Sequence, residues 1–269
     1  MEVWEIALLA LVQGVTEFLP ISSSGHIVAL GTLLNLETAQ LDEVTIALHF
    51  GTLLAICVVY FKQLCEVVSG TRSLLWPLVL GSIPAGVTGM LVMNLQWEEE
   101  LNNPALTGLM LIVTGLVLIF GRIKSNRFTD NNDGRVSQKI ALLIGFSQAI
   151  AILPGISRSG MTIVTGRRLG LSAELSAKFS FLLAIPIIGG ASLITIYRLW
   201  GNSGGIASDL APQQQPGLHL LLIGVTISAI VGWLSLRWLI RLLECGNFHR
   251  FAYWCIPLGT ILLIYSLYG

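Results

Sequence analysis

The sequence predicts an all-α membrane protein with several spanning helices, built from two related halves. Of its 269 residues, 54% are hydrophobic and only 11% are charged, and the mean hydropathy is +0.79. A soluble domain carries about 25% charged residues. Several apolar runs approach the roughly 20 residues that cross a bilayer, and the second half of the chain repeats features of the first. A polytopic, helical membrane protein follows.

The apolar runs are the predicted membrane-spanning helices. They cover residues 45–61, 74–95, 105–120, 179–197, 218–240 and 251–268. Glu2 and Glu5 stand where a cleavable signal peptide would carry basic residues, so we expect the first segment to be retained. The net charge is zero, which gives no electrostatic basis for binding nucleic acid. The four cysteines show no C-x-x-C spacing and are predicted to be packing residues.

A duplication accounts for the order of the motifs. Gln13 precedes the segment 22–25 by the same spacing that separates Gln148 from the segment 157–160, and the pattern FxxLLAI begins at both Phe50 and Phe179. We therefore predict one membrane domain, residues 1–269, made of a first repeat (1–121), a polar cytoplasmic link (122–139) and a second repeat (140–269). Turn-forming residues 131–134 lie in the link, and a loop rich in Gly, Ser, Gln and Pro covers 201–217.

Lysine and arginine set the expected orientation. The link and the segments 62–72, 163–178 and 241–250 are basic, whereas 27–45, 94–104 and 201–217 carry no Lys or Arg. The link is then cytoplasmic and both termini lie outside, provided that 13–26 and 148–162 are re-entrant hairpins that return to the side they enter. Each repeat has one such hairpin and three transmembrane helices. Because three is odd, the repeats are inverted relative to each other, and their hairpins meet near the midplane.

The first hairpin carries an acid, a histidine and three serines within an apolar third of the chain. Gln13 and Glu17 share one face of a helix that Pro20 interrupts. Glu17 is a candidate metal ligand or acid–base group because intramembrane acids are functional by default; a buried structural acid is the alternative. Its oxygens suit Mg²⁺ or Ca²⁺ if substrate phosphates complete the coordination. His26, near Ser23, is a candidate base or nucleophile.

The second hairpin suits an oxyanion. Arg158 stands between Ser157 and Ser159, with Thr162 one turn later, and neighbouring glycines let the backbone approach a ligand. Arginine adds a bidentate fork for phosphate. An arginine that only caps a helix or reaches to the interface is the alternative, which its place inside an apolar hairpin disfavours. The remaining histidines are predicted to be structural: His49, His219 and His249.

Together these motifs resemble those of the bacterial undecaprenyl-pyrophosphate phosphatases of the bacitracin-resistance family. The family's (E/Q)xxxE motif matches residues 13–17, its FLPxSSxGH motif matches 18–26, and its PGxSRSxxT motif matches 154–162. The resemblance runs the full length of the chain, including the duplication. Gln13 stands where many members have Glu, so any metal would be held with less negative charge.

The resemblance implies hydrolysis of undecaprenyl diphosphate to undecaprenyl phosphate and inorganic phosphate, with a divalent cation (Mg²⁺ or Ca²⁺). This reaction recycles the lipid carrier for cell-wall synthesis and confers bacitracin resistance. The resemblance also implies a location in the plasma (inner) membrane of a bacterium, with the active site opening to the outer face.

The same resemblance assigns roles to residues of both hairpins. Glu17 and Gln13 would hold the metal, and Arg158 would bind the diphosphate. His26 or Ser23 would attack phosphorus or activate the attacker, and we favour His26. Covalent phosphohistidine, covalent phosphoserine and direct attack by water all stay open. The hydroxyls that would help Arg158 cradle the substrate belong to Ser157, Ser159, Thr162, Ser22 and Ser24.

A polyprenyl-phosphate transporter or flippase is the competing function. Inverted repeats with re-entrant hairpins are a transporter architecture, and a phosphate-binding arginine at the midplane would also suit the movement of a lipid phosphate. Membrane lipids and an isoprenyl diphosphate are the expected partners, without nucleic acid, and a homodimer is compatible with the sequence. The Lys-x6-Arg-Pro run of acid-phosphatase-like membrane enzymes does not occur, which sets that class aside.

Overall fold

A computed structural model describes residues 1–36, 38–69, 74–95, 97, 101, 103–122, 135–202, 217–244 and 247–268. The predicted turn at 131–134, most of the polar link, most of the 201–217 loop and the acidic run at 98–100 lie outside the described residues. Helices account for the regular structure of the described part, in which no strand occurs. The all-α prediction is confirmed.

The helices follow the apolar runs closely. Their bounds are α1 Val3–Thr16, α2 Ser23–Leu33, α3 Thr38–Val59, α4 Phe61–Ser69, α5 Leu75–Asn94, α7 Pro104–Phe120, α8 Gln138–Ile150, α9 Arg158–Arg168, α10 Ala173–Asn202, α11 Leu218–Glu244 and α12 Ala252–Tyr268, with a short 3-10 helix, η2 Phe248–Phe251, before α12. Every predicted spanning segment therefore coincides with a helix.

Within the described residues, 4 helices are long and apolar enough to cross a membrane: Leu75–Asn94, Ala173–Ile194, Leu218–Leu243 and Phe248–Tyr268. A fifth span is possible where Val44–Val59 continues into Phe61–Val67, but the chain bends there by 79°. The predicted span 45–61 ended at this break, and the helix α4 that follows it was not predicted. The sixth predicted span, α7, has 17 residues, about 25 Å of helix at 1.5 Å per residue. The protein is a multi-pass membrane protein.

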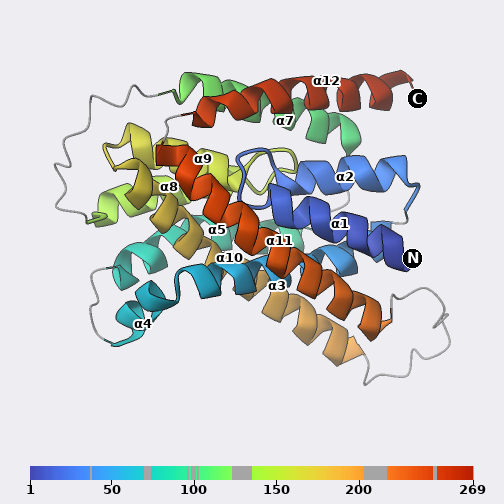
Figure 1. Ribbon diagram of the computed structural model, residues 1–269, viewed down its shortest axis with the longest axis horizontal. Coiled ribbons are helices and arrows are strands. Elements are labelled where there is room, and N and C mark those ends of the chain that lie inside the picture. The colour runs from blue at the N-terminus through green and yellow to red at the C-terminus, as the bar shows by residue number, and fades with distance from the viewer. Residues whose placement is uncertain are drawn as a thin grey trace.

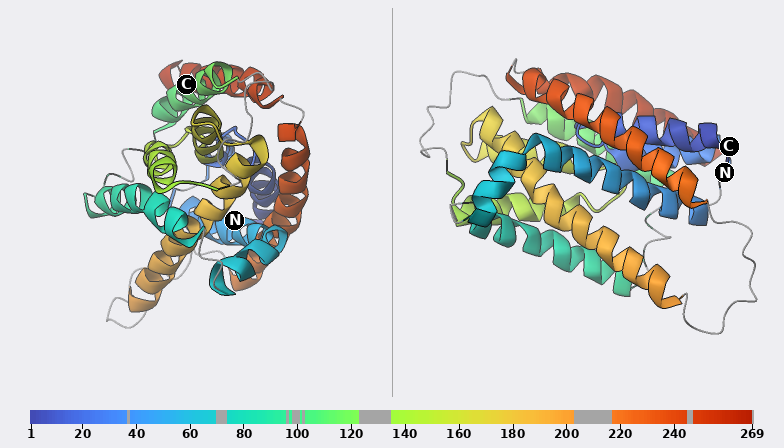
Figure 2. Two further views of the ribbon diagram at one scale, coloured as in Figure 1. Left: turned by 90° about the vertical axis from the view of Figure 1, so that its left-hand side faces the viewer. Right: turned by 60° about the horizontal axis from the view of Figure 1, so that its bottom comes forward.

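The longer helices surround the two hairpins. α1 packs against α11, α8 packs against α5, and α3 packs against both α11 and α10. α7 and α12 lie side by side along one flank (Figure 1). In the end-on view of Figure 2, α9 lies inside the ring that the outer helices form. Both termini lie at the same end of the molecule in both figures.

Basic residues gather at the opposite end. The ends of α9 and α11 and the starts of α8 and α10 lie away from the termini (Figure 1). These helix ends carry Lys139, Arg167, Arg168, Lys178 and Arg241. Arg168 also donates a hydrogen bond to the carbonyl of Phe120, which ties α9 to the end of α7. Arg158 is an exception, because it starts α9 in the interior.

Both hairpins break ahead of a proline, as expected for a residue that disfavours helix before it. α1 ends at Thr16, four residues before Pro20, and α8 ends at Ile150, four residues before Pro154. The two breaks touch: Ser159 Oγ donates to the Leu19 carbonyl over 3.2 Å. Gly155 adopts φ +93°, and a Cβ there would lie 2.3 Å from the Thr107 carbonyl oxygen, so only glycine fits. The breaks thus bring two distant segments together.

Candidate functional site

Glu17 lies at the first break, and its carboxylate joins the two hairpins. Arg158 Nη2 donates to Glu17 Oε1 over 2.6 Å, across 141 residues of sequence. The Glu17 side chain is 5% exposed and that of Arg158 is 17% exposed. Removal of one partner of an ion pair this buried strongly destabilises the protein, because the other charge is left buried without compensation. The structure therefore places the acid of one motif directly on the arginine of the other.

The second carboxylate oxygen of Glu17 collects contacts from three elements. Ser23 Oγ donates to Oε2 over 2.7 Å, and Gln13 Nε2 donates to it over 3.0 Å. His49 Nε2, from α3, lies 3.4 Å from the same oxygen. Gln13 and Glu17 do share a helix face, since they are one turn apart. His49 was expected to be structural, and its contact with the acid was missed by the sequence analysis.

Ser23 is the first residue of α2, so its hydroxyl sits at a helix N-terminus. The preceding residue, Ser22, caps this helix: its Oγ accepts a hydrogen bond from Gly25 N over 3.3 Å. Ser22 has φ 65°, which is uncommon for a residue other than glycine. Ser22 and Ser24 hydroxyls lie 3.1 Å apart. The start of α2 thus presents hydroxyls and unpaired amides, the usual environment for an anion.

Arg158 begins α9 in the same manner. Ser157 caps the helix by accepting from Gly160 N over 3.1 Å. Arg158 Nη1 donates to the Ser180 carbonyl on α10 over 3.4 Å, which gives the guanidinium a second anchor besides Glu17. Thr114 on α7 accepts from Ser157 N and donates to Gly155 O, at 3.0 and 2.8 Å. The second break is therefore held in place by residues of α7 and α10 that the local motif did not predict.

The other predicted hydroxyls of the second hairpin face the protein. Ser159 bonds the Leu19 carbonyl, and Thr162 Oγ1 lies 2.6 Å from Ser180 Oγ and 2.8 Å from the Arg158 carbonyl oxygen. Ser157, Ser159 and Thr162 are all buried. In this conformation they support the hairpin around Arg158, and their expected contact with substrate would require them to exchange partners.

His26 lies one turn into α2, and within the described residues it makes no hydrogen bond to Glu17, Ser23 or Arg158. Its Nδ1 lies 2.8 Å from the Ser22 carbonyl, which can only accept, so Nδ1 carries the proton. Its Nε2 accepts from Trp254 Nε1 on α12 over 2.8 Å. The two rings are nearly parallel, 5° apart with centroids separated by 6.2 Å. Both ring nitrogens are thus already occupied.

The donor set around Glu17 fits a cation that is shared with a phosphate. Gln13 Oε1 is buried without a hydrogen-bond partner, beside the Glu17 carboxylate. Amide and carboxylate oxygens suit Mg²⁺ or Ca²⁺. No group of three or more His, Cys, Asp or Glu side chains comes together in the part of the chain that the structure describes. A complete protein cage for a metal is therefore absent there, and the substrate would have to supply oxygens.

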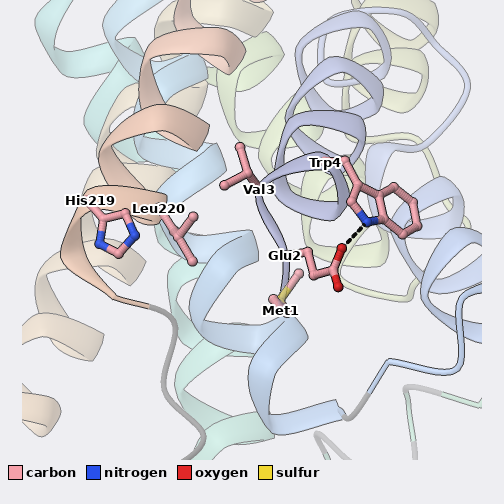
Figure 3. A pocket seen from close by; sticks show the side chains of 6 residues that line it. All are labelled: Met1, Glu2, Val3, Trp4, His219 and Leu220. Carbon is pink, nitrogen blue, oxygen red and sulfur yellow. Dashed lines mark hydrogen bonds between the residues drawn. The ribbon is translucent and has the colours of Figure 1, made fainter.

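A separate surface pocket of about 590 Å³ lies at the end of the molecule that holds the termini. Met1, Glu2, Val3, Trp4, His219 and Leu220 line it, and Figure 3 shows Trp4 Nε1 donating to Glu2 Oε2, at 2.6 Å. None of the predicted site residues lines this pocket. The polar cluster at the hairpin breaks is therefore the candidate site, and it is largely enclosed.

Comparisons with known proteins agree with the motifs. The family described as "Bacitracin resistance protein BacA" matches residues 6–261. A protein named undecaprenyl-diphosphatase from Rhodopirellula baltica is 43% identical over 269 residues, covering 99% of each chain. One of the same name from Pelotomaculum thermopropionicum is 36% identical, covering 98% of this chain and 97% of its own. Undecaprenyl-diphosphatase 2 of Stutzerimonas stutzeri is 37% identical, covering 98% of each. The chain belongs to the bacitracin resistance protein BacA family.

Proposed function

We propose that the protein hydrolyses undecaprenyl diphosphate to undecaprenyl phosphate and inorganic phosphate. The observation that carries this function is the Ser23–Glu17–Arg158 chain of contacts, with Ser23 at the start of α2 and Arg158 at the start of α9. The relatives named undecaprenyl-diphosphatase support the substrate. The reaction returns the lipid carrier to cell-wall synthesis, and it confers bacitracin resistance by removing the antibiotic's lipid target.

Arg158 binds the diphosphate in this proposal. Its planar guanidinium matches two phosphate oxygens, and the N-termini of α2 and α9 add amides and a favourable dipole. The hydroxyls of Ser22 and Ser24 at the start of α2 assist. When Arg158 turns toward phosphate, it releases part of its hold on Glu17, so substrate binding itself makes the carboxylate a better proton acceptor.

Ser23 is the attacking group. Its Oγ forms a bond to the terminal phosphorus, the bond from that phosphorus to the bridging oxygen breaks, and undecaprenyl phosphate leaves. Glu17 Oε2, which already accepts the Ser23 hydrogen bond, takes the proton. The departing phosphate carries that proton away. Glu17 then takes a proton from a water whose oxygen attacks the phosphorus of the phosphoserine, the bond from phosphorus to Ser23 Oγ breaks, and Glu17 returns the proton to Oγ as inorganic phosphate leaves.

The contacts favour Ser23 over His26 for this step. Sequence reasoning preferred His26, but that ring is held by Ser22 and Trp254 and touches neither Glu17 nor Arg158. A base must lie within hydrogen-bond reach of the proton it takes. In this proposal His26 supports the start of α2 instead of attacking phosphorus.

A divalent cation, Mg²⁺ or Ca²⁺, would be held by Glu17 and the unpartnered Oε1 of Gln13, together with phosphate oxygens. Its chemistry when bound is to neutralise charge on the diphosphate. Gln13 also orients the acid through its Nε2 hydrogen bond. Gln in place of Glu at this position lowers the negative charge of the donor set, so cation binding is expected to depend strongly on substrate.

The proposed membrane arrangement is two inverted repeats, 1–121 and 140–269, joined by a cytoplasmic link, 122–139. The reciprocal packing of α1 on α11 and α8 on α5 supports it, because these helices hold equivalent places in the two repeats. The basic end of the molecule would face the cytoplasm and both termini would lie outside, in the inner membrane of a bacterium, with the site open to the outer face. A homodimer stays a prediction, which light scattering of the purified protein tests.

Release of phosphate from undecaprenyl diphosphate by the purified protein in detergent, with Mg²⁺ or Ca²⁺, tests the reaction. Wild type is expected to release phosphate and to leave label on Ser23 when substrate labelled in its terminal phosphate is quenched with acid. Ser23→Ala should abolish both signals. Ser266→Ala, whose hydroxyl bonds only its own helix at the Leu263 carbonyl, is the matched control. Hydrolysis by Ser23→Ala at the wild-type rate would contradict the serine assignment.

A lipid-phosphate transporter is the second candidate, favoured by the touching breaks of two hairpins in the interior. Detergent solution separates the two functions because it has no sides to transport between. Phosphate release there requires hydrolysis. Its absence, together with movement of labelled undecaprenyl phosphate across vesicles containing the protein, would support the transporter.

A further inference from the structure

His49 contacts Glu17, but the proposed reaction gives it no role. It lies near the middle of α3, and its side chain is 25% exposed. Its Nε2 is 3.4 Å from Glu17 Oε2, the carboxylate oxygen that accepts the Ser23 hydroxyl. Arg158 contacts the other oxygen, Oε1. His49 and Arg158 therefore approach the carboxylate from its two separate oxygens.

The orientation of the His49 ring is set by its other nitrogen. Nδ1 lies 2.7 Å from the Thr45 carbonyl, one turn earlier in α3. A carbonyl oxygen only accepts, so Nδ1 donates to it, and Nε2 faces Glu17, where the ring forms an ion pair when both nitrogens carry a proton. The ring is thus anchored at one edge and directed at the acid with the other.

The backbone under His49 is fixed by α11. Ser228 Oγ donates to the Leu48 carbonyl over 3.0 Å. At Gly51 the two helices come so close that a Cβ would lie 2.5 Å from the Val225 carbonyl oxygen. Thr52 Oγ1 donates to the His49 carbonyl over 2.9 Å. A ring on a segment held this closely by α11 can set the position of a neighbouring carboxylate.

We propose that His49 is a positioning residue for Glu17, which holds Oε2 toward the Ser23 hydroxyl through the ion pair at its Nε2. The inference rests on the proposed function. The contact between His49 and Glu17 matters most when the substrate draws Arg158 toward phosphate, because Glu17 then loses its strongest partner. His49 does not contact Ser23, so it acts through Glu17 and is not a second base. Misplacement of a reacting group by about 1 Å costs up to about 100-fold in rate.

Three variants test the role in purified protein, with undecaprenyl diphosphate and Mg²⁺ in detergent. His49→Leu removes the ion pair with Glu17, and His49→Gln places an uncharged N–H donor at a similar reach without the ring. His219→Leu is the matched control, since His219 lines the distant pocket in Figure 3. Elution as a single species and the melting temperature verify folding. His49→Phe, which keeps the ring size, replaces His49→Leu if the latter does not fold.

His49→Leu is expected to lower kcat by about 10- to 100-fold while KM changes by less than about 3-fold, because His49 touches the acid and not the substrate. His49→Gln should recover most of the lost kcat, and His219→Leu should match wild type. Wild-type kcat in His49→Leu, or a His49→Gln enzyme as slow as His49→Leu, would overturn the positioning role. Absence of hydrolysis by wild type would overturn the proposed function and the role of His49 with it.

Discussion

The two hairpins share a frame but differ in chemistry. Each has a glutamine near the end of its first helix, a proline in its break, and a serine that caps its second helix by accepting from the glycine three residues later. At the position four residues after the glutamine, the first hairpin has Glu17 and the second has Ile152. At the first position of the second helix, the first has Ser23 and the second has Arg158. The two hairpins thus share a frame and carry different functional groups.

Gln13 and Gln148, which hold equivalent positions in the two hairpins, differ in their hydrogen bonds. Gln13 Nε2 donates to Glu17, whereas the amide of Gln148, buried like Gln13, has no hydrogen-bond partner among the described residues at either its nitrogen or its oxygen. Ile152 offers no acceptor where Glu17 provides one. A buried amide without hydrogen-bond partners lowers the stability of the fold. The Gln148 amide therefore destabilises the second hairpin, whereas the equivalent Gln13 amide orients Glu17 in the first. The comparison predicts opposite responses to equivalent substitutions in the two hairpins.

The largest effect is expected at Glu17. Glu17→Gln should lower kcat by roughly 10²- to 10⁴-fold, the usual contribution of a general base, because the amide cannot take the Ser23 proton. Phosphate release at saturating substrate measures it. Ile152→Leu, at the equivalent place in the second hairpin, is the control and should keep near wild-type activity. Equal losses in the two variants would mean that the hairpins contribute alike, contrary to the division described above.

A smaller effect is expected when charge is added beside the acid. Gln13→Glu should lower the Mg²⁺ concentration needed for half-maximal activity by about 10-fold, since a second carboxylate strengthens an oxygen donor set for a hard cation. Titration of the activity with Mg²⁺ after treatment with EDTA measures the change. Gln148→Glu is the comparison and should leave the midpoint where it was. A Gln13→Glu enzyme with an unchanged midpoint would remove Gln13 from the proposed cation site.

The smallest effect concerns stability. Gln148→Leu should stabilise the protein by about 1 kcal/mol, because it removes a buried polar group that lacks partners. The melting temperature in detergent should then rise by roughly 2 °C. Gln13→Leu should lower it, since Glu17 loses a hydrogen bond. A lower melting temperature in Gln148→Leu would show that the Gln148 amide has a partner, such as a bound water.

Much of the frame is predictable from local sequence. Long apolar runs predict the spanning helices, and Pro20 and Pro154 predict the breaks. The polar residues of the two motifs predict that Glu17 and Arg158 belong to one site. The bend between α3 and α4 was not predicted, since the largely apolar run 45–61 contains no proline. A sequence pattern reports composition, and the direction of a helix depends on what it packs against.

The contacts that refine the site come from helices remote in the chain. His49 reaches Glu17 from α3, Thr114 pins the second break from α7, and Trp254 occupies His26 from α12. No spacing rule connects these positions, because their meeting depends on helix packing. A histidine inside an otherwise apolar run was the available signal at His49.

A double-mutant cycle on Glu17 and Arg158 tests most directly whether the hairpins form one site. The measurement is kcat/KM for undecaprenyl diphosphate in wild type, Glu17→Gln, Arg158→Lys and the double variant, with folding verified for each. Residues that act as a unit are strongly non-additive. One composite site predicts that the double variant is hardly slower than Glu17→Gln alone. Losses that multiply in the double variant would contradict it, since they would show that the two hairpins contribute independently.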